Sequence, residues 1–471
     1  MRYKFRTRPY PHQVDALKRF WRKGFLALLW EPGTGKTKAT IDIACALFQA
    51  GKARRMLIVA PLSVVGVWKE EFELHATSPY SLFIMDKIWY KRLPYAVKWS
   101  MMQEDHMTVV VVNYDIIWRR KEVAKMFAPG LVVADESHRI KKPSAKRSRF
   151  MATQNNAPYR MILTGTPTPK GVVDIYSQWK FLNPKRFGTR VEDFIEQYGV
   201  RGGFMGFEVK GVRLDTVKEL RKKIRWDASV VRKDTALDLP DRMYQRVPVY
   251  LEPAAQEYYE KMALEMYLEL ERGDISDAKN AAVRLLRLQQ ITGGFIKSDQ
   301  KNIHQLSTAK LNVAADLLED LTSDGQRVVV FARFIPEVLA LTDIGERLGV
   351  RTYTLYGATR REDRDNIRRD FQTKKAPAIF VAQISTGGLG ITLHAAHEVL
   401  YYSTTYSLED WIQSADRVHR IGQTEKVTYR TLIAEGTVEE DIYAALRAKK
   451  RILNMIMKDH KILKRRLSHD V

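Results

Sequence analysis

Short apolar runs recur along the first part of the chain, and each ends at a turn or a polar cluster. They lie at residues 25–30, 56–60, 109–112, 131–134 and 160–163. Helical apolar spacing follows the first run, at Ile41, Ala44, Cys45 and Phe48. Apolar strands that alternate with helices are typical of an α/β fold built on a parallel sheet, in which ligands bind at the carboxyl ends of the strands.

The pattern changes after residue 170. Long amphipathic stretches at residues 174–182, 215–224 and 254–270 predict helical protrusions and a linker. From Ser307 the alternation of helices and strands resumes. It predicts a helix over 310–321 and strands over 327–331, 351–355, 378–381 and 398–402. We therefore expect a second α/β unit.

The loop after the first apolar run has the pattern of a phosphate-binding loop. It reads Glu31-Pro32-Gly33-Thr34-Gly35-Lys36-Thr37 and opens a helix. Glycines let backbone N–H groups approach phosphates closely, and the helix N-terminus favours negative charge. We expect Lys36 to reach the β and γ phosphates of ATP and the Thr37 hydroxyl to bind Mg²⁺. The strict pattern has a glycine where this chain has Trp30.

Two acids follow the run at residues 131–134 directly. Asp135 is a candidate Mg²⁺ ligand, and Glu136 is a candidate general base that polarises the attacking water. The alternative is a strand whose end meets solvent. Nearer the N-terminus, the side-chain amide of Gln13 is able to read an adenine edge, and a solvated glutamine at a helix start is the alternative.

The charge of the chain predicts an anionic macromolecular partner. Lys and Arg number 78 against 55 Asp and Glu, which gives a net charge of +23. Nucleic acid is the simplest such partner, bound with salt-dependent affinity. The basic run at residues 139–149, which includes Lys141 and Lys142, is either a contact with a phosphate backbone or a solvated face.

The second unit carries candidate groups but no glycine loop with a lysine. A glycine loop at residues 385–391 contains Thr386 and Gly390. Arg417 and Arg420 are three residues apart, and this spacing predicts that they share one helix face, suited to the γ-phosphate. The alternative is a pair of surface arginines that bind neighbouring acids.

Taken in order, these motifs resemble those of the superfamily 2 helicases. The segment Arg417 to Gln423, Arg-Val-His-Arg-Ile-Gly-Gln, resembles the last motif of the Swi/Snf-type ATPases, the chromatin-remodeller-like branch. Pro61-Leu62-Ser63 followed by Trp68 and Glu70, and Val231-Arg232-Lys233 followed by Leu239-Pro240, are similar to that branch as well. The resemblance covers about residues 9–457.

The resemblance implies two RecA-like lobes of the P-loop type, with helical protrusions between and on them. It implies ATP and Mg²⁺ as cofactors, arginine fingers at Arg417 and Arg420, and an adenine contact at Gln13. Further nucleotide contacts are expected from Gly33, Thr34, Gly35 and Gly390. Candidate DNA contacts are Ser63, Asn113, Lys141, Lys142 and Thr386.

The chain departs from the family pattern without losing a catalytic group. Trp30 stands in place of an acid, and Thr386 and Thr392 stand in place of Ala and Asn around the glycines. Tyr406-Ser407-Leu408 replaces Trp-Asn-Pro. These changes affect the residues expected to contact DNA and to couple it to ATP.

Pattern and resemblance together divide the chain into four segments. Residues 1–235 are expected to form the ATP-binding lobe with a protrusion, 236–305 a protrusion and linker, 306–450 the second lobe, and 451–471 a basic helix or tail. The expected function is a DNA-stimulated ATPase that translocates on double-stranded DNA and remodels protein–DNA or branched DNA structures. A strand-separating or annealing helicase is one alternative, and a nucleotide-gated DNA-binding scaffold is another.

The length of the chain favours a minimal, monomeric bacterial or viral motor, or one subunit of an assembly with a replication, repair or specificity protein. No secretory signal and no long apolar run is present in the sequence. We therefore expect a soluble intracellular protein, in a bacterial or viral-host cytoplasm.

Overall fold

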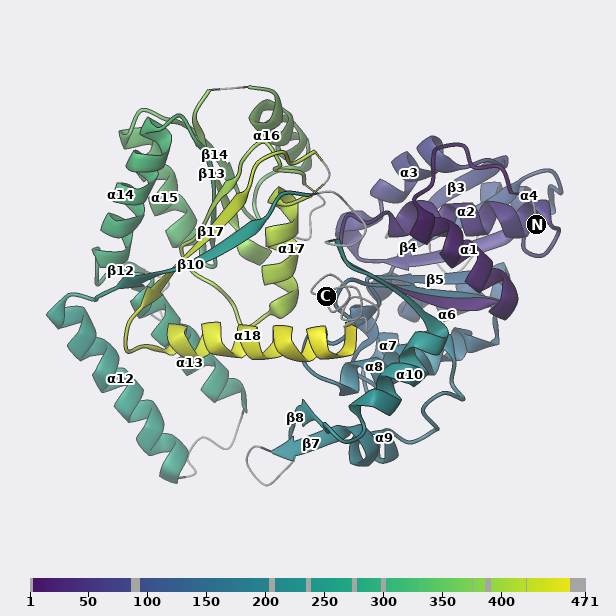
Figure 1. Cartoon of the computed structure of the whole chain (residues 1–471), viewed down its shortest axis with the longest axis horizontal. Coiled ribbons are helices and arrows are strands. Elements are labelled where there is room, and N and C mark those ends of the chain that lie inside the picture. Colours follow the sequence, from purple (N-terminus) through teal and green to yellow (C-terminus); the bar gives the residue numbers. More distant parts are fainter. Residues whose placement is uncertain are drawn as a thin grey trace, which may run out of the picture. The chain divides into compact units, whose positions relative to one another are not determined.

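A computed structural model of the chain forms two compact units (Figure 1). The first comprises Met1–Asp238 and Lys449–Val471, and the second comprises Leu239–Ala448. The structure describes residues 3–85, 94–202, 208–233, 239–272, 278–297, 302–374, 376–385, 391–420 and 422–457.

The first unit is built on a seven-stranded parallel sheet of order β3-β4-β2-β5-β6-β1-β9. Its strands are β1 (Phe25–Trp30), β2 (Arg55–Ala60), β3 (Tyr80–Met85), β4 (Met107–Asn113), β5 (Leu131–Asp135), β6 (Tyr159–Leu163) and β9 (Ala228–Val231). Because every pairing is parallel, the carboxyl ends of all these strands meet at one edge. That edge carries the predicted phosphate-binding loop after β1 and the predicted acids at the end of β5.

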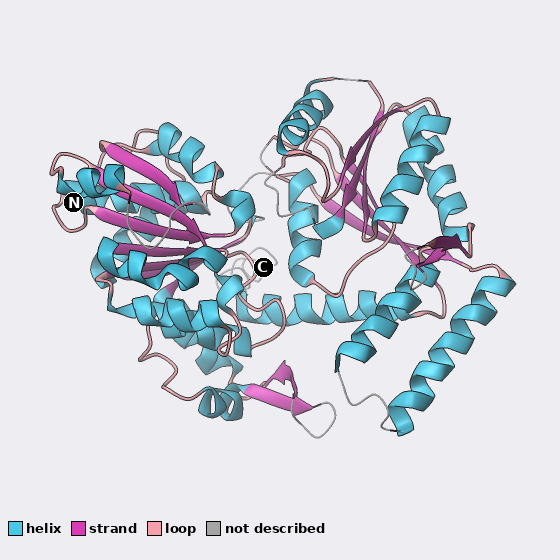
Figure 2. Ribbon diagram, turned by 180° about the vertical axis from the view of Figure 1, so that it is seen from behind, coloured by secondary structure: helices cyan, strands magenta, loops and turns pink. Residues whose placement is uncertain are grey.

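Helices cover both faces of this sheet (Figure 2). They are α1 (Pro11–Lys23), α2 (Lys36–Gln49), α3 (Val67–His75), α4 (Tyr95–Met102), α5 (Tyr114–Ile117), α6 (Lys121–Phe127), α7 (Lys146–Thr153), α8 (Val173–Leu182), α9 (Val191–Tyr198) and α10 (Val217–Asp227). On one face, Phe20 of α1, Ile41 of α2 and Phe72 of α3 pack in a single buried cluster with Ile58 and Val109 of the central strands. A short antiparallel hairpin, β7 (Gly199–Gly202) and β8 (Glu208–Val212), follows α9.

The second unit is built on a six-stranded parallel sheet of order β10-β17-β16-β13-β15-β14. Its strands are β10 (Arg242–Val249), β13 (Arg327–Ala332), β14 (Arg351–Leu355), β15 (Ala378–Gln383), β16 (Glu398–Tyr401) and β17 (Val427–Ala434). Its helices are α12 (Pro253–Arg272), α13 (Ala278–Thr292), α14 (Ala309–Ser323), α15 (Ile335–Arg347), α16 (Arg361–Thr373), α17 (Leu408–Val418) and the start of α18 (Val438–Met457). The hairpin β11 (Phe295–Lys297) and β12 (Ile303–Gln305) follows α13.

One core of this unit lies between its sheet and two helices. Leu318 of α14 and Leu341 of α15 pack against Val330, Val381 and Leu400 of the sheet. Two parallel sheets flanked by helices confirm the predicted α/β fold class.

Of the strands in the two large sheets, β3, β9, β10 and β17 are absent from the predicted set. The clearest case is β10, which lies within residues 236–305 and pairs in parallel with β17. It is an edge strand that carries Pro248 and the charged Arg242 and Arg246, and most of its residues are partly or fully exposed. Edge strands tolerate proline and charge, so their sequences resemble loops. The domain boundaries given above stay predictions.

A buried ion pair ties the first turn of α18 into the second unit. Lys310 Nζ lies 2.6 Å from Glu439 Oε1, with exposed side-chain fractions of 1% and 5%. The same carboxylate accepts hydrogen bonds from Thr292 Oγ1 at 3.0 Å and from the backbone N–H of Ala434 at 2.9 Å. A buried charge that keeps all these partners is tolerated, but one that loses its counter-ion is strongly destabilising.

Glu439→Gln is therefore expected to destabilise the protein by about 3–5 kcal/mol, because it leaves the Lys310 ammonium buried without a counter-charge. The measurement is the urea unfolding midpoint followed by circular dichroism. Glu440→Gln is the matched control. Glu440 is only partly buried, with 39% of its side chain exposed, and pairs with Arg246 near the surface, so this change should leave the midpoint almost unchanged. Equal midpoints for the two variants would contradict the assignment.

Within the part of the chain that the structure describes, no helix combines the length and the apolar character needed to cross a membrane.

Candidate functional site

The predicted phosphate-binding loop connects β1 to α2. Gly33 and Gly35 have φ of 80° and 81°, in the left-handed region that favours glycine. A Cβ on Gly35 would also lie 2.3 Å from Gln13 Nε2. The side chain of Thr34 is buried and its Oγ1 donates to Glu31 O at 2.7 Å. The glycines thus allow a tight loop that ends at the N-terminus of α2, where backbone N–H groups are suited to an anion.

Lys36 and Thr37 occupy the first turn of α2. Lys36 Nζ donates to the carbonyl oxygen of Trp30 at 3.0 Å, so the ammonium lies back over the end of β1. Trp30 itself is fully buried and donates through Nε1 to Ser229 Oγ at 3.0 Å. The indole of Trp30 therefore links β1 to the neighbouring strand β9.

Asp135 ends β5 and is almost buried, with an exposed fraction of 9%. Its Oδ2 accepts from Trp68 Nε1 at 3.0 Å, and its Oδ1 accepts from the backbone N–H of Glu136 at 2.9 Å. Burial and the neighbouring Glu136 raise the pKa of Asp135 to about 7, whereas Lys36 acts in the opposite direction. A buried carboxyl next to a second acid is suited to binding a divalent cation, because the cation would balance the negative charge of the two carboxylates.

Glu136 has a backbone φ of 47°, a left-handed conformation that is unusual for a residue with a side chain. Its Oε2 lies 3.2 Å from His138 Nδ1, which also lies 3.2 Å from Thr164 Oγ1. The backbone N–H of Thr166 donates to the same threonine hydroxyl at 3.1 Å. His138 is buried and thus connects the acid after β5 to the Thr164–Thr166 turn after β6.

Gln178 of α8 belongs to this network and was not among the predicted site residues. Its Oε1 accepts from Ser137 Oγ at 2.7 Å, and its Nε2 donates to Pro167 O at 2.7 Å. The sequence signal is weak: a polar residue on a helix whose Ile175 and Trp179 are buried. Gln178 therefore links the turn after β5 to the turn after β6.

Gln13 lies under the phosphate-binding loop rather than in solvent. It is 2% exposed; its Nε2 donates to Gly35 O at 3.0 Å, and its Oε1 accepts from the backbone N–H of Tyr10 at 2.9 Å. The neighbouring His12 Nε2 lies 2.9 Å from Thr34 O. Helix α1 therefore holds the loop, and the adenine contact of Gln13 stays a prediction.

The candidate DNA-contacting residues of the first unit lie at or after the carboxyl ends of strands in the same sheet. Ser63 lies in the short 3-10 turn Leu62–Val64 after β2, and Lys141 and Lys142 follow the 3-10 turn Ser137–Ile140 after β5. Asn113 ends β4, and its Oδ1 caps α5 by accepting from Asp115 N at 2.7 Å. This cap gives Asn113 a structural role, and its contact with DNA stays a prediction.

In the second unit, the prediction that Arg417 and Arg420 share one helix face is wrong. Helix α17 ends at Val418, so Arg417 lies in its last turn and Arg420 lies beyond it. The turn that follows contains Gly422 with φ of 99°, which a helix cannot accommodate. Arg420 Nη1 instead donates to Thr392 Oγ1 at 2.7 Å. Thr386 and Gly390 lie outside the described residues.

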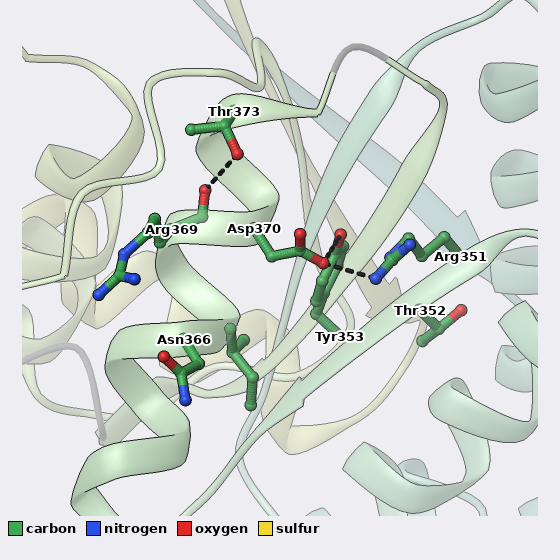
Figure 3. A pocket seen from close by; sticks show the side chains of 8 residues that line it. Arg351, Thr352, Tyr353, Asn366, Arg369, Asp370 and Thr373 are labelled. Atoms are coloured by element: carbon green, nitrogen blue, oxygen red, sulfur yellow. Dashed lines mark hydrogen bonds and ion pairs between the residues drawn. The ribbon is translucent and has the colours of Figure 1, made fainter.

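A cavity of about 520 Å³ opens elsewhere in the second unit, between β14 and α16 (Figure 3). Arg351, Tyr353 and Asp370 lie together on one side of it, joined by a 2.6 Å Arg351–Asp370 ion pair. None of the predicted site residues lines this cavity.

Comparison with known proteins identifies the family. A SNF2-related domain matches residues 17–294, which is more than half of the chain. The chain belongs to the SNF2-related family. A helicase conserved C-terminal domain matches residues 309–422 of this SNF2-related protein. The family assignment and the two sheets confirm the predicted Swi/Snf-type resemblance, the two RecA-like lobes and the enzyme class, an ATP hydrolase of helicase superfamily 2.

Curated relatives are larger proteins. The SWI/SNF chromatin-remodeling complex subunit snf22 of Schizosaccharomyces pombe is 26% identical over 436 residues, which cover 88% of this SNF2-related chain and 25% of that protein. Chromodomain-helicase-DNA-binding protein 1-like of Mus musculus is 27% identical over 450 residues, which cover 91% of this chain and 47% of that protein. The chain therefore spans less than half the length of either relative.

One solved structure aligns with most of this chain. The SWI2/SNF2 ATPase core of Sulfolobus solfataricus in complex with double-stranded DNA is 24% identical, with a TM-score of 0.43 and coverage of 96% of this SNF2-related chain and 93% of that one.

Proposed function

We propose that this protein is an ATP-driven motor that translocates on double-stranded DNA and remodels protein–DNA or branched DNA structures. The observation that carries the proposal is the meeting of a glycine loop, its lysine and two acids at one sheet edge of a SNF2-related chain. The net charge of +23 supports binding to a polyanion such as DNA.

The ATP site would divide the work between charge stabilisation and proton transfer. The loop N–H groups and Lys36 would bind the phosphates. Thr37 and Asp135 would hold Mg²⁺, which neutralises phosphate charge when bound. Glu136 would accept a proton from the attacking water. Arg417 and Arg420 of the second unit would stabilise charge on the transferred phosphoryl group.

Coupling to DNA would start from the bonds around Glu136. The 3.2 Å approach of His138 Nδ1 to Glu136 Oε2, and its equal distance from Thr164 Oγ1, give the catalytic acid a connection to a second strand end. A rearrangement of the turn after β6 would thereby alter how Glu136 is held. Ser63, Asn113, Lys141, Lys142 and Thr386 would contact or sense the DNA backbone, and Gln13 and Gly390 the nucleotide.

The test compares a triplex on duplex flanks with a forked duplex, each with ATP. A duplex translocase displaces the third strand of the triplex and leaves the fork annealed. The Glu136→Gln protein is the control, because it should bind the same DNA without displacing the strand. Fork unwinding without triplex displacement would replace the proposal by a strand-separating helicase, and DNA binding without ATP turnover would replace it by a scaffold.

A further inference from the structure

The side chain of Arg420 is held by a residue far from it in the sequence. Arg420 Nη1 donates to the hydroxyl oxygen of Thr392 at 2.7 Å. Because α17 ends at Val418, the helix itself does not hold Arg420. A long, flexible arginine side chain beyond a helix end needs an external acceptor if its guanidinium is to keep one orientation.

The loop that carries Thr392 is clamped from two sides by glutamine side chains. From α16, Gln372 donates through Nε2 to the carbonyl oxygen of Thr392 and accepts through Oε1 from Ala395 N at 3.0 Å. From the other side, Gln423 Nε2 donates to Ala396 O at 2.8 Å and to His394 O at 3.2 Å. The hydroxyl of Thr392 is therefore fixed relative to the turn that carries Arg420.

The turn after Arg420 packs tightly against the same loop. A Cβ on Gly422 would lie 3.1–3.3 Å from the ring atoms of His394, and the φ of 99° also requires glycine. Burial, and secondly the charge of Arg420, lower the pKa of His394. The imidazole therefore adds no positive charge beside the guanidinium at neutral pH.

We propose that Thr392 is a positioning residue of Arg420: its hydroxyl orients the guanidinium for the ATP phosphates, in a loop that Gln372 and Gln423 hold in place. The inference rests on the proposed function, because it needs Arg420 to act on ATP. In this role Thr392 acts through Arg420 and needs no contact of its own with the nucleotide. Its contribution is the orientation of a charge that stabilises the transition state, and orientation affects turnover more than substrate binding.

Thr392→Val removes the acceptor and keeps the branched shape. We expect kcat for ATP hydrolysis to fall by about ten- to hundred-fold, the size expected for one hydrogen bond to a charged group, while KM for ATP stays within about two-fold. Thr392→Ser retains the hydroxyl and should restore kcat close to the wild-type value. Thr373→Val, the same change at an exposed threonine of α16, should leave kcat unchanged. An unaltered thermal unfolding midpoint shows that the variant protein remains folded.

A second measurement separates this inference from the proposed function. Arg420→Ala alone should lower kcat by about a thousand-fold or more, and adding Thr392→Val to it should cause no further loss. A wild-type protein without ATPase activity, or an Arg420→Ala protein with full activity, overturns the proposed function and the inference with it. Normal or raised kcat in Thr392→Val, no rescue by serine, or an equal loss in the Arg420→Ala background overturns the inference alone.

Discussion

Lys36→Ala is expected to abolish ATP binding and to lower ATP hydrolysis by at least about a hundred- to thousand-fold, the range seen when one preorganised donor to a developing charge is removed. Lys36 Nζ donates to the carbonyl oxygen of Trp30, which lies at the end of a strand paired on both sides. Its loss removes a phosphate contact and no part of the apolar core, so the protein should remain folded. Binding is measured with a fluorescent ATP analogue and turnover by phosphate release.

Lys52→Ala is the matched control for this change. Lys52 is exposed beyond the other end of α2, so its truncation removes the same charge from the same unit without touching the glycine loop. Unchanged ATPase activity in a folded Lys36→Ala protein would contradict the assignment of the loop.

Glu136→Gln is expected to keep ATP bound and to slow hydrolysis by about a hundred- to ten-thousand-fold, because an amide cannot accept the proton of the attacking water. Glutamine has the same size and can still approach His138 Nδ1, which lies 3.2 Å from the glutamate oxygen. ATP affinity and single-turnover hydrolysis are measured separately. Glu73→Gln, at an exposed position of α3, serves as the control and should change neither. Weakened ATP binding with normal turnover in Glu136→Gln would exclude the role of general base.

Local pattern was sufficient where a segment's chemistry and its structure are set by neighbours in the sequence. The run that becomes β1, the glycines of the loop and the start of α2 are contiguous, so glycine spacing and apolar runs predict them together. The acids at the end of β5 follow a fully buried strand and are predicted for the same reason.

Pattern failed where a contact joins distant residues or where a backbone turn interrupts a period. Thr392 and Gln372 lie in different elements from Arg420, and nothing near them in the sequence indicates that they meet. The three-residue spacing of Arg417 and Arg420 indicates a shared face only if the helix continues, and the positive φ of Gly422 follows its end.

The left-handed backbone of Glu136 has a consequence for protein engineering. Such a conformation costs a side-chain-bearing residue roughly 1–3 kcal/mol, and glycine adopts it freely. Selection for heat resistance alone would therefore favour glycine at position 136, and the selected proteins would be more stable but would lack the proposed general base. Thermostable variants of this protein should therefore be sequenced first at position 136 and then assayed for ATPase activity.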